Sequence, residues 1–229
     1  MIEKCTELGV GKIVPIKSEH TERGALTALL GSSSSRGNQK CNYDPLYGGH
    51  DKENNDSNSI LFDKLEVQAV EAAEQCERLS IPCITSIPFP LPNESSEGEV
   101  WDIQDLVKEW CHEWEEGQKF SGDRGDAMGP TGGRTLLICR ERASDESTVV
   151  PVLRALQDKQ RVSFVVGPEG GWSTEEKRMI DSICSKYIGQ DDAPIRCVSL
   201  GTSVLRAETA SLMAVGAWVL NTELSNEPI

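Results

Sequence analysis

Three glycines within five residues mark the first place in the sequence where chemistry could be done. Residues 167–171 read GPEGG and follow the apolar run VSFVV at 162–166. Because glycine lacks a Cβ, a ligand can approach the backbone closely there and meet exposed N–H groups. A tight strand-to-helix turn would need the same glycines, so both interpretations stay open. A nucleotide P-loop is disfavoured, because no Gly-Lys-Ser/Thr follows and Glu169 would repel a triphosphate.

Two further segments place charged side chains after apolar runs. Residues 200–206 read LGTSVLR and lead into AETA, so that Arg206 and Glu208 stand together at the start of an apolar helix. This pair is either a helix-start ion pair or a catalytic pair. Arg140 and Arg142 follow the run LLIC at 136–139 and form the best candidate for a phosphate-binding patch. A solvated mixed-charge surface is the alternative interpretation.

The elements that would position these loops alternate along the chain. Apolar runs predict buried strands at 136–139, 162–166 and 196–200, with shorter strands at 12–18 and 81–87. Helical spacing predicts helices at 60–79, 102–116, 149–156 and 208–220, and the capping box Ser173-x-x-Glu176 opens another. Residues 2–10 resemble the last turns of a helix that Gly9 ends. The pattern predicts an α/β fold with a parallel sheet and helices on both faces, whose ligands bind at the carboxyl ends of the strands.

Composition limits the classes of function. The 229 residues carry a formal charge of −14, which argues against nucleic-acid binding by bulk electrostatics and leaves only a local basic patch for that role. No apolar run approaches the roughly 20 residues that cross a bilayer. The eight cysteines show no CxxC pair, and no Cys/His cluster has metal-site spacing. We therefore expect a soluble, intracellular protein without a metal.

Two low-complexity stretches interrupt what we interpret as one domain over residues 1–229. Residues 31–59 are rich in Ser, Asn, Gly and Asp, and we expect a disordered insertion there. A second, acidic and Pro/Gly-rich insertion covers about 93–133, and residues 93–134 hold half of the negative charge excess. The last helix is apolar on most sides, so it should lie inside the protein or in a subunit interface.

Four segments together resemble one known family. They are IEKCTELGVGKIVPIKSE at 2–19, AAEQCER at 72–78, VVGPEGGWSTEE at 165–176 and LGTSVLRAETA at 200–210. In this order they resemble the 16S rRNA uracil-N3 methyltransferases of the RsmE type, which belong to the SPOUT class. The resemblance implies a C-terminal trefoil knot, a homodimer, S-adenosylmethionine as methyl donor and small-subunit ribosomal RNA as substrate. Such a knot is an exception to ordinary topology, and composition would not indicate it.

The resemblance also implies roles for individual residues. The cofactor would be held by two knot loops and the helix that follows them: Gly167, Pro168, Glu169, Gly170, Gly171, Leu200, Gly201, Val204, Leu205, Arg206, Thr209 and Ala210. Methylation at N3 needs loss of the ring proton, and Arg206 is the candidate to stabilise the resulting negative charge. Glu208 or Glu169 would orient Arg206 or relay the proton. Arg140 and Arg142 would contact the RNA.

The sequence departs from the family pattern at several positions, and these departures support an alternative to an active methyltransferase. Thr202 and Ser203 stand where the family has Pro and Arg, and His20 stands where it has Arg. The family's N-terminal PUA-like RNA-binding domain and the first strand of the sheet are expected to be absent, as in a truncated gene model or a reduced form. The alternative is therefore an inactive cofactor-binding or dimerisation module. The insertions are of a eukaryotic kind, so the compartment would be the cytoplasm, a plastid or a mitochondrion.

Overall fold

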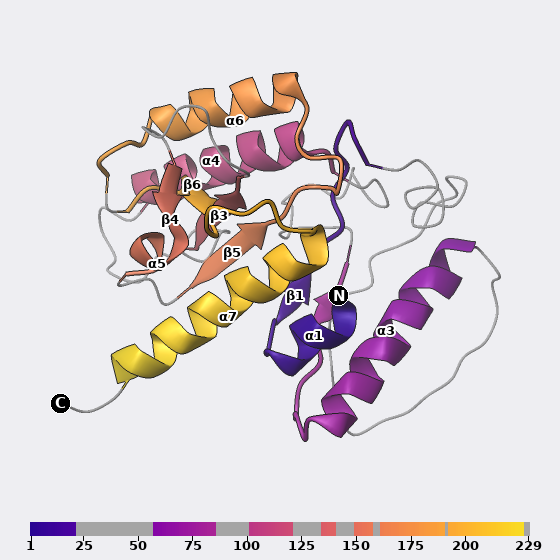
Figure 1. Ribbon diagram of the computed structural model, residues 1–229. Helices are drawn as coiled ribbons and strands as arrows, with labels where there is room; N and C mark the ends of the chain where they lie inside the picture. Colours follow the sequence, from indigo (N-terminus) through magenta and orange to yellow (C-terminus); the bar gives the residue numbers. More distant parts are fainter. Residues whose placement is uncertain are drawn as a thin grey trace.

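The computed structural model describes residues 1–21, 57–85, 101–120, 134–140, 149–157, 161–190 and 192–226. Its helices and strands alternate as expected for an α/β chain (Figure 1). In order they are α1 (Ile2–Glu7), β1 (Lys12–Ile13), α3 (Ser57–Gln75), β2 (Cys83–Ile84), α4 (Ile103–Phe120), β3 (Thr135–Cys139), β4 (Val149–Pro151), α5 (Val152–Ala155), β5 (Val162–Val165), α6 (Thr174–Ser185), β6 (Ile195–Ser199) and α7 (Ala207–Asn226).

The main sheet has four strands in the order β4-β6-β3-β5, and every pairing in it is parallel. Strand β3 lies inside the sheet, where Leu137 pairs with Phe164 on one side and with Arg196 on the other. All five residues of β3 are buried, which explains its continuous apolar sequence. The predicted parallel sheet is therefore confirmed.

Helices cover both faces of this sheet, as the sequence predicts (Figure 1). Helices α4 and α6 pack on one face through Val107, Trp110 and Ile180, and Trp110 Nε1 donates to the carbonyl oxygen of Pro194 at 3.1 Å. Helices α5 and α7 pack on the other face, where Leu156 and Ala214 are fully buried. Side chains of β3 alternate between these two cores, so a single strand holds both layers together.

A smaller unit at the N-terminus pairs β1 with β2 in parallel and packs α1 against α3. Its core is formed by Ile2, Ala69 and Ile84. Gly9 follows α1 at a φ of +79°, which confirms a helix end that only glycine adopts without strain. After β1 the chain forms a parallel bridge with the residues that precede α4, in which Lys17 N donates to Trp101 O at 2.8 Å.

Some expectations need correction. Residues 149–156 do not form one helix, because 149–151 extend the sheet as β4 and only 152–155 are helical. Residues 57–59, assigned to a disordered insertion, begin α3, and α3 ends at Gln75, before Glu77 takes a φ of +53°. Residues 103–120, placed in the acidic insertion at about 93–133, form α4, whose Val107 and Trp110 belong to the core; much of the rest of the two insertions lies outside the described residues. None of the described helices combines the length and apolar character that a membrane crossing requires.

Candidate functional site

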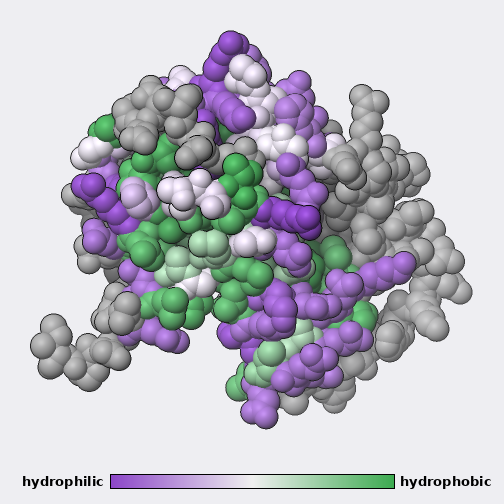
Figure 2. Space-filling model, in the orientation of Figure 1, coloured by the Kyte–Doolittle hydropathy of each residue, from purple (hydrophilic) through white to green (hydrophobic). Residues whose placement is uncertain are grey.

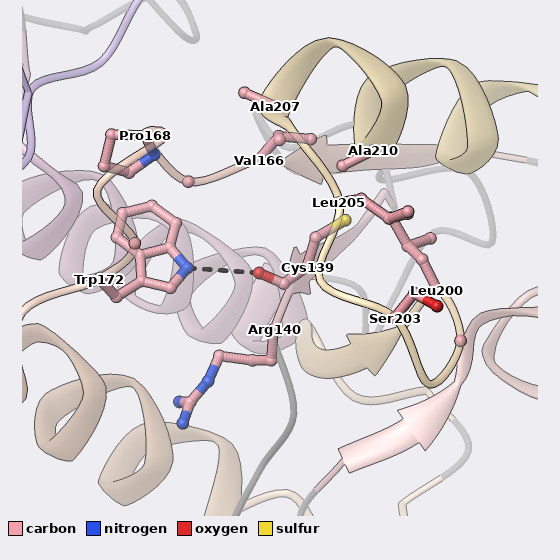
Figure 3. Close-up of a pocket in the computed structure, with 13 residues that line it drawn as sticks. Cys139, Arg140, Val166, Pro168, Trp172, Leu200, Ser203, Leu205, Ala207 and Ala210 are labelled. Carbon is pink, nitrogen blue, oxygen red and sulfur yellow. Dashed lines mark hydrogen bonds between the residues drawn. The ribbon is translucent and has the colours of Figure 1, made fainter.

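Two segments far apart in the sequence enclose one cavity at the carboxyl ends of β3, β5 and β6. The cavity is open to solvent, and its empty space is about 500 Å³ when the solvent at its mouth is included. Figure 3 shows Pro168 and Trp172 on one side and Leu200, Ser203 and Leu205 on the other. The described residues that line it are Cys139, Arg140, Val166, Gly167, Pro168, Gly171, Trp172, Leu200, Gly201, Ser203, Leu205, Ala207 and Ala210.

The first loop, residues 166–172, is built around Trp172. This side chain is 3% exposed, and its Nε1 donates to the carbonyl oxygen of Cys139 at 3.3 Å (Figure 3). A Cβ on Gly167 would lie 2.9 Å from the indole ring, so only glycine fits beside it. Gly171 has a φ of +69° and donates its N–H to Pro168 O at 2.9 Å, which closes a turn. The glycines thus make a tight turn and also border the cavity.

The second loop, residues 200–206, carries the chain from β6 to α7. Gly201 has a φ of +137°, a backbone conformation that favours glycine. Ser199 Oγ donates to Gly201 O at 3.0 Å and accepts from Gly201 N at 3.2 Å, so the last side chain of β6 holds the start of the loop. Ala207 and Ala210 then present the first turn of α7 to the cavity, and their small side chains leave space in front of the backbone.

The structure brings together about half of the residues that the resemblance assigns to the cofactor. Those that line the cavity are Gly167, Pro168, Gly171, Leu200, Gly201, Leu205 and Ala210. Glu169, Val204, Arg206 and Thr209 are not among the lining residues, although the backbone oxygen of Arg206 accepts from Ala210 N at 2.8 Å at the start of α7. Their side chains are exposed.

The three predicted catalytic side chains, Glu169, Arg206 and Glu208, are all exposed. Glu208 Oε1 accepts from the amino group of Met1 at 3.2 Å, so no ion pair joins it to Arg206 in the structure. Their catalytic roles stay predictions, and they would need substrate or a partner to bring them together.

Gly170 faces a neighbour and not the cavity. A Cβ built on it would lie 3.0 Å from His20 Cβ and 3.5 Å from His20 O. This glycine is therefore required by the close passage of residues 17–21. His20 was singled out in the sequence only as a departure from a family pattern, and nothing in its spacing indicates this contact.

Arg140 lies in the cavity wall, but its guanidinium extends toward α6 (Figure 3). It donates to Asp181 through two nitrogens, at 2.6 Å and 3.3 Å, and its side chain is 7% exposed. This pairing neutralises the one charged side chain among the described lining residues. Contact of Arg140 with RNA stays a prediction, and Arg142 lies outside the described residues.

Five lining residues were not among the site residues expected from the sequence, namely Cys139, Val166, Trp172, Ser203 and Ala207. Each lies within or beside a segment already singled out, so the strand ends were the available signal. Burial raises the pKa of the Cys139 thiol to about 12. Cys139 is therefore a neutral thiol at neutral pH and adds apolar surface without being a nucleophile.

One group of metal-ligand side chains occurs among the described residues. Glu109, His112 and Glu113 on α4 place their ligand atoms within 4.8 Å of one another. None of them lines the cavity. The cavity itself offers backbone groups, the neutral Cys139 thiol, the Ser203 hydroxyl, the paired Arg140 and apolar side chains, a set that suits an organic ligand better than a metal ion.

The site is a ligand cavity of the kind that parallel α/β sheets form at the carboxyl ends of their strands, and here it lies between two glycine-bearing loops. The family model described as an RNA methyltransferase domain matches residues 103–219, which include both loops and every strand of the main sheet. The chain therefore belongs to the RNA methyltransferase domain family.

Individual relatives agree with this assignment. The chain is 24% identical over 157 residues to the ribosomal RNA small subunit methyltransferase E of Rickettsia conorii, covering 69% of this chain and 46% of that protein. The chain thus spans about half the length of this curated relative. A probable rRNA-methyltransferase from Porphyromonas gingivalis has the same fold, with a TM-score of 0.51, 22% identity, and coverage of 99% of this chain and 62% of that one.

A ribosomal RNA small subunit methyltransferase E from Neisseria gonorrhoeae, solved with bound S-adenosyl methionine, is also similar. Its TM-score is 0.47 at 20% identity, over 94% of this chain and 57% of that chain.

Proposed function

We propose that this chain binds S-adenosylmethionine between residues 166–172 and 200–205. The observation that carries the proposal is that these two loops, about 30 residues apart in sequence, line one cavity together with the start of α7. The loops contribute two glycines with positive φ, Gly171 and Gly201, where the backbone can approach a ligand most closely.

The residues present suit this cofactor. Among the described lining residues Arg140 is the one charged group, and Asp181 already neutralises it. A positively charged sulfonium would therefore meet no free cation in the described cavity wall. Apolar side chains from Val166, Leu200 and Leu205 give a flat aromatic base surfaces to pack against.

The reaction that we propose is methylation of N3 of uracil in small-subunit ribosomal RNA. The cofactor would supply a methyl group on a positively charged sulfur. N3 must lose its proton first, and the negative charge then spreads over the two flanking carbonyl oxygens. Arg206 would stabilise this charge, and Glu208 or Glu169 would orient Arg206 or pass the proton to solvent. Their exposure leaves them accessible to an RNA substrate.

Two measurements on the full chain test this function. Calorimetry should detect binding of S-adenosylmethionine and no binding of ATP; the reverse result would contradict the cofactor assignment. Methyl transfer to unmodified small-subunit rRNA should then fall by about 100-fold in Arg206→Ala, the usual cost of removing a group that stabilises developing charge. Arg178→Ala serves as the matched control, because Arg178 is 73% exposed on α6 and, within the part of the chain that the structure describes, pairs with Glu175 alone. Equal turnover in the two variants would remove Arg206 from the mechanism.

The shortage of free cations in the expected RNA patch supports a second candidate function. Arg140, the described member of the expected RNA patch, is buried and paired, and the chain carries a net charge of −14. A module that binds the cofactor or dimerises without methylating RNA is consistent with that shortage of free cations. Cofactor binding without any methyl transfer to rRNA would favour this alternative.

A homodimer is also proposed, and α7 is the surface that supports it. Met213 and Leu220 are spaced seven residues apart on this helix and are 45% and 62% exposed. Figure 2 shows hydrophobic side chains gathered over the face where α5 and α7 lie. A second copy of the chain would cover the apolar face of this helix.

A further inference from the structure

The loop at 166–172 is held from outside by a single imidazole. His20 Nδ1 lies 3.1 Å from the carbonyl oxygen of Gly170 and 3.0 Å from that of Gly171. Both partners can only accept a hydrogen bond, so Nδ1 must carry a proton and donate to both. The hydrogen bonds cross 150 residues of sequence and connect the N-terminal segment to the cavity loop.

The backbone that carries His20 is itself fixed. Ser18 N donates to Thr21 Oγ1 at 3.0 Å, and Thr21 N donates back to Ser18 O at 3.1 Å, which closes a turn around His20. Glu19 N donates to Glu176 Oε1 at 2.9 Å, the same carboxylate that caps α6. His20 is exposed, but its position is determined by the neighbouring residues on both sides.

The loop is shaped to receive this side chain. Gly170 lacks the Cβ that would lie 3.0 Å from His20 Cβ, so the two backbones can pass close together. The contact therefore depends on Gly170 in the cavity loop and on the imidazole of His20 in the N-terminal segment. Such complementary shape is not required by the turn alone, because Gly170 has no positive φ.

The hydrogen bonds set the direction of two peptide groups. In a trans peptide the C=O and the following N–H point in opposite directions. With Gly170 O held by His20, the N–H of Gly171 is directed to Pro168 O, where it is bound at 2.9 Å. With Gly171 O held by His20, the N–H of Trp172 points away from His20. No acceptor in the described ranges takes this N–H, and Trp172 lines the cavity.

We propose that His20 is a positioning residue for the cofactor loop, which it presets by binding the carbonyl oxygens of Gly170 and Gly171. This inference rests on the proposed function for its effect on cofactor affinity, because a loop that is ordered before binding loses less conformational entropy when the ligand arrives. Its effect on the loop itself is independent of any ligand.

Three substitutions at one position separate the hydrogen bond from the bulk of the ring. Asn places its amide nitrogen near the position of Nδ1 and can donate to the same carbonyl oxygens, whereas Gln places its amide nitrogen near Nε2. Ala removes both nitrogens. His20→Asn should therefore rescue what His20→Ala and His20→Gln lose. His112→Ala is the matched control, because His112 is an exposed histidine on α4 that does not line the cavity.

The first readout needs no ligand. Hydrogen exchange of the peptide spanning residues 166–173 in the free protein should be about tenfold faster in His20→Ala and His20→Gln than in the parent. Exchange in His20→Asn and His112→Ala should stay within about threefold of the parent. Unchanged exchange in His20→Ala, or equal exchange in the Asn and Gln variants, would overturn the proposal.

The second readout is the dissociation constant of S-adenosylmethionine by calorimetry. We expect an increase of about tenfold in His20→Ala and His20→Gln, as for loss of one good hydrogen bond, with the Asn variant close to the parent. If the parent binds no S-adenosylmethionine while the exchange pattern holds, the proposed function fails and the role of His20 in the loop stands. If the parent binds it and all variants bind equally, the positioning role fails.

Discussion

Gly167 packs so closely against the indole ring of Trp172 that the energetic effect of adding a side chain there can be worked out from the structure. A Cβ added there would lie 2.9 Å from Cε2, 3.0 Å from Nε1 and 3.2 Å from Cζ2 of Trp172. The indole cannot easily move away, because it is 3% exposed and its Nε1 is bound to Cys139 O. Gly167→Ala must therefore displace either the loop or the ring.

Two costs follow from that displacement. Overpacking a dense site costs about 1–3 kcal/mol, and loss of the indole hydrogen bond adds about 0.5–1.5 kcal/mol. We expect Gly167→Ala to lower the free energy of unfolding by about 2–4 kcal/mol, measured by urea denaturation. For a chain of this size the midpoint temperature should fall by roughly 5–15 °C.

Gly216→Ala is the matched control, since Gly216 lies within α7 and has no atom within 4 Å of the added Cβ. It should stabilise the protein by about 0.5–1 kcal/mol through helix propensity. A double variant with Trp172→Phe should show less destabilisation than the sum of the single changes, by at least about 0.5 kcal/mol, because the contact is shared. If Gly167→Ala proves as benign as Gly216→Ala, the packing of the indole against this glycine is wrong.

Two further predictions concern α7 and the cavity wall. Leu220→Asp should raise the dissociation constant of the homodimer by at least about tenfold in sedimentation experiments, because a charge would replace a 62% exposed apolar side chain on the proposed interface; an unchanged constant would place the interface elsewhere. Burial raises the pKa of Cys139 to about 12, so the stability linked to its neutral thiol is present below the unfolded value of 9.0 and is lost as pH rises from there toward 12. A thiol reagent should accordingly modify the exposed Cys76 at pH about 8 and leave Cys139 unmodified, as read by mass spectrometry. Modification of Cys139 at the rate of Cys76 would contradict its burial.

The fold was largely predictable from sequence, because its signals are local. Strand β3 is buried on both faces and therefore has the uninterrupted apolar sequence that marks a central parallel strand. The capping box at Ser173 is complete in the structure, with Ser173 N donating to Glu176 Oε2 at 2.8 Å. Residues 149–151 belong to a short apolar run without a clear period, so the sequence alone predicts a helix there, and only their pairing with β6 makes them a strand.

The candidate site was predictable only in part, since its construction depends on tertiary contacts. Strand order places both glycine loops at one edge of the sheet, and the sequence indicated that edge. The sequence could not show that Gly167 makes room for Trp172, or that Gly170 makes room for His20. Arg140 looked like a free cation because its partner Asp181 is 41 residues away, on a helix that packs beside the strand end.

The double use of Glu176 restricts which residue this position can hold. A capping box generally accepts Glu or Gln, because only one side-chain oxygen is needed. Here Oε2 accepts from Ser173 N and Oε1 accepts from Glu19 N, so both oxygens are occupied by donors. Glutamine would bring its NH₂ group against one of these N–H groups, so either Ser173 at the helix start or the segment 17–21 would have to detach. A change that is silent at most helix starts would here uncouple two distant parts of the polypeptide.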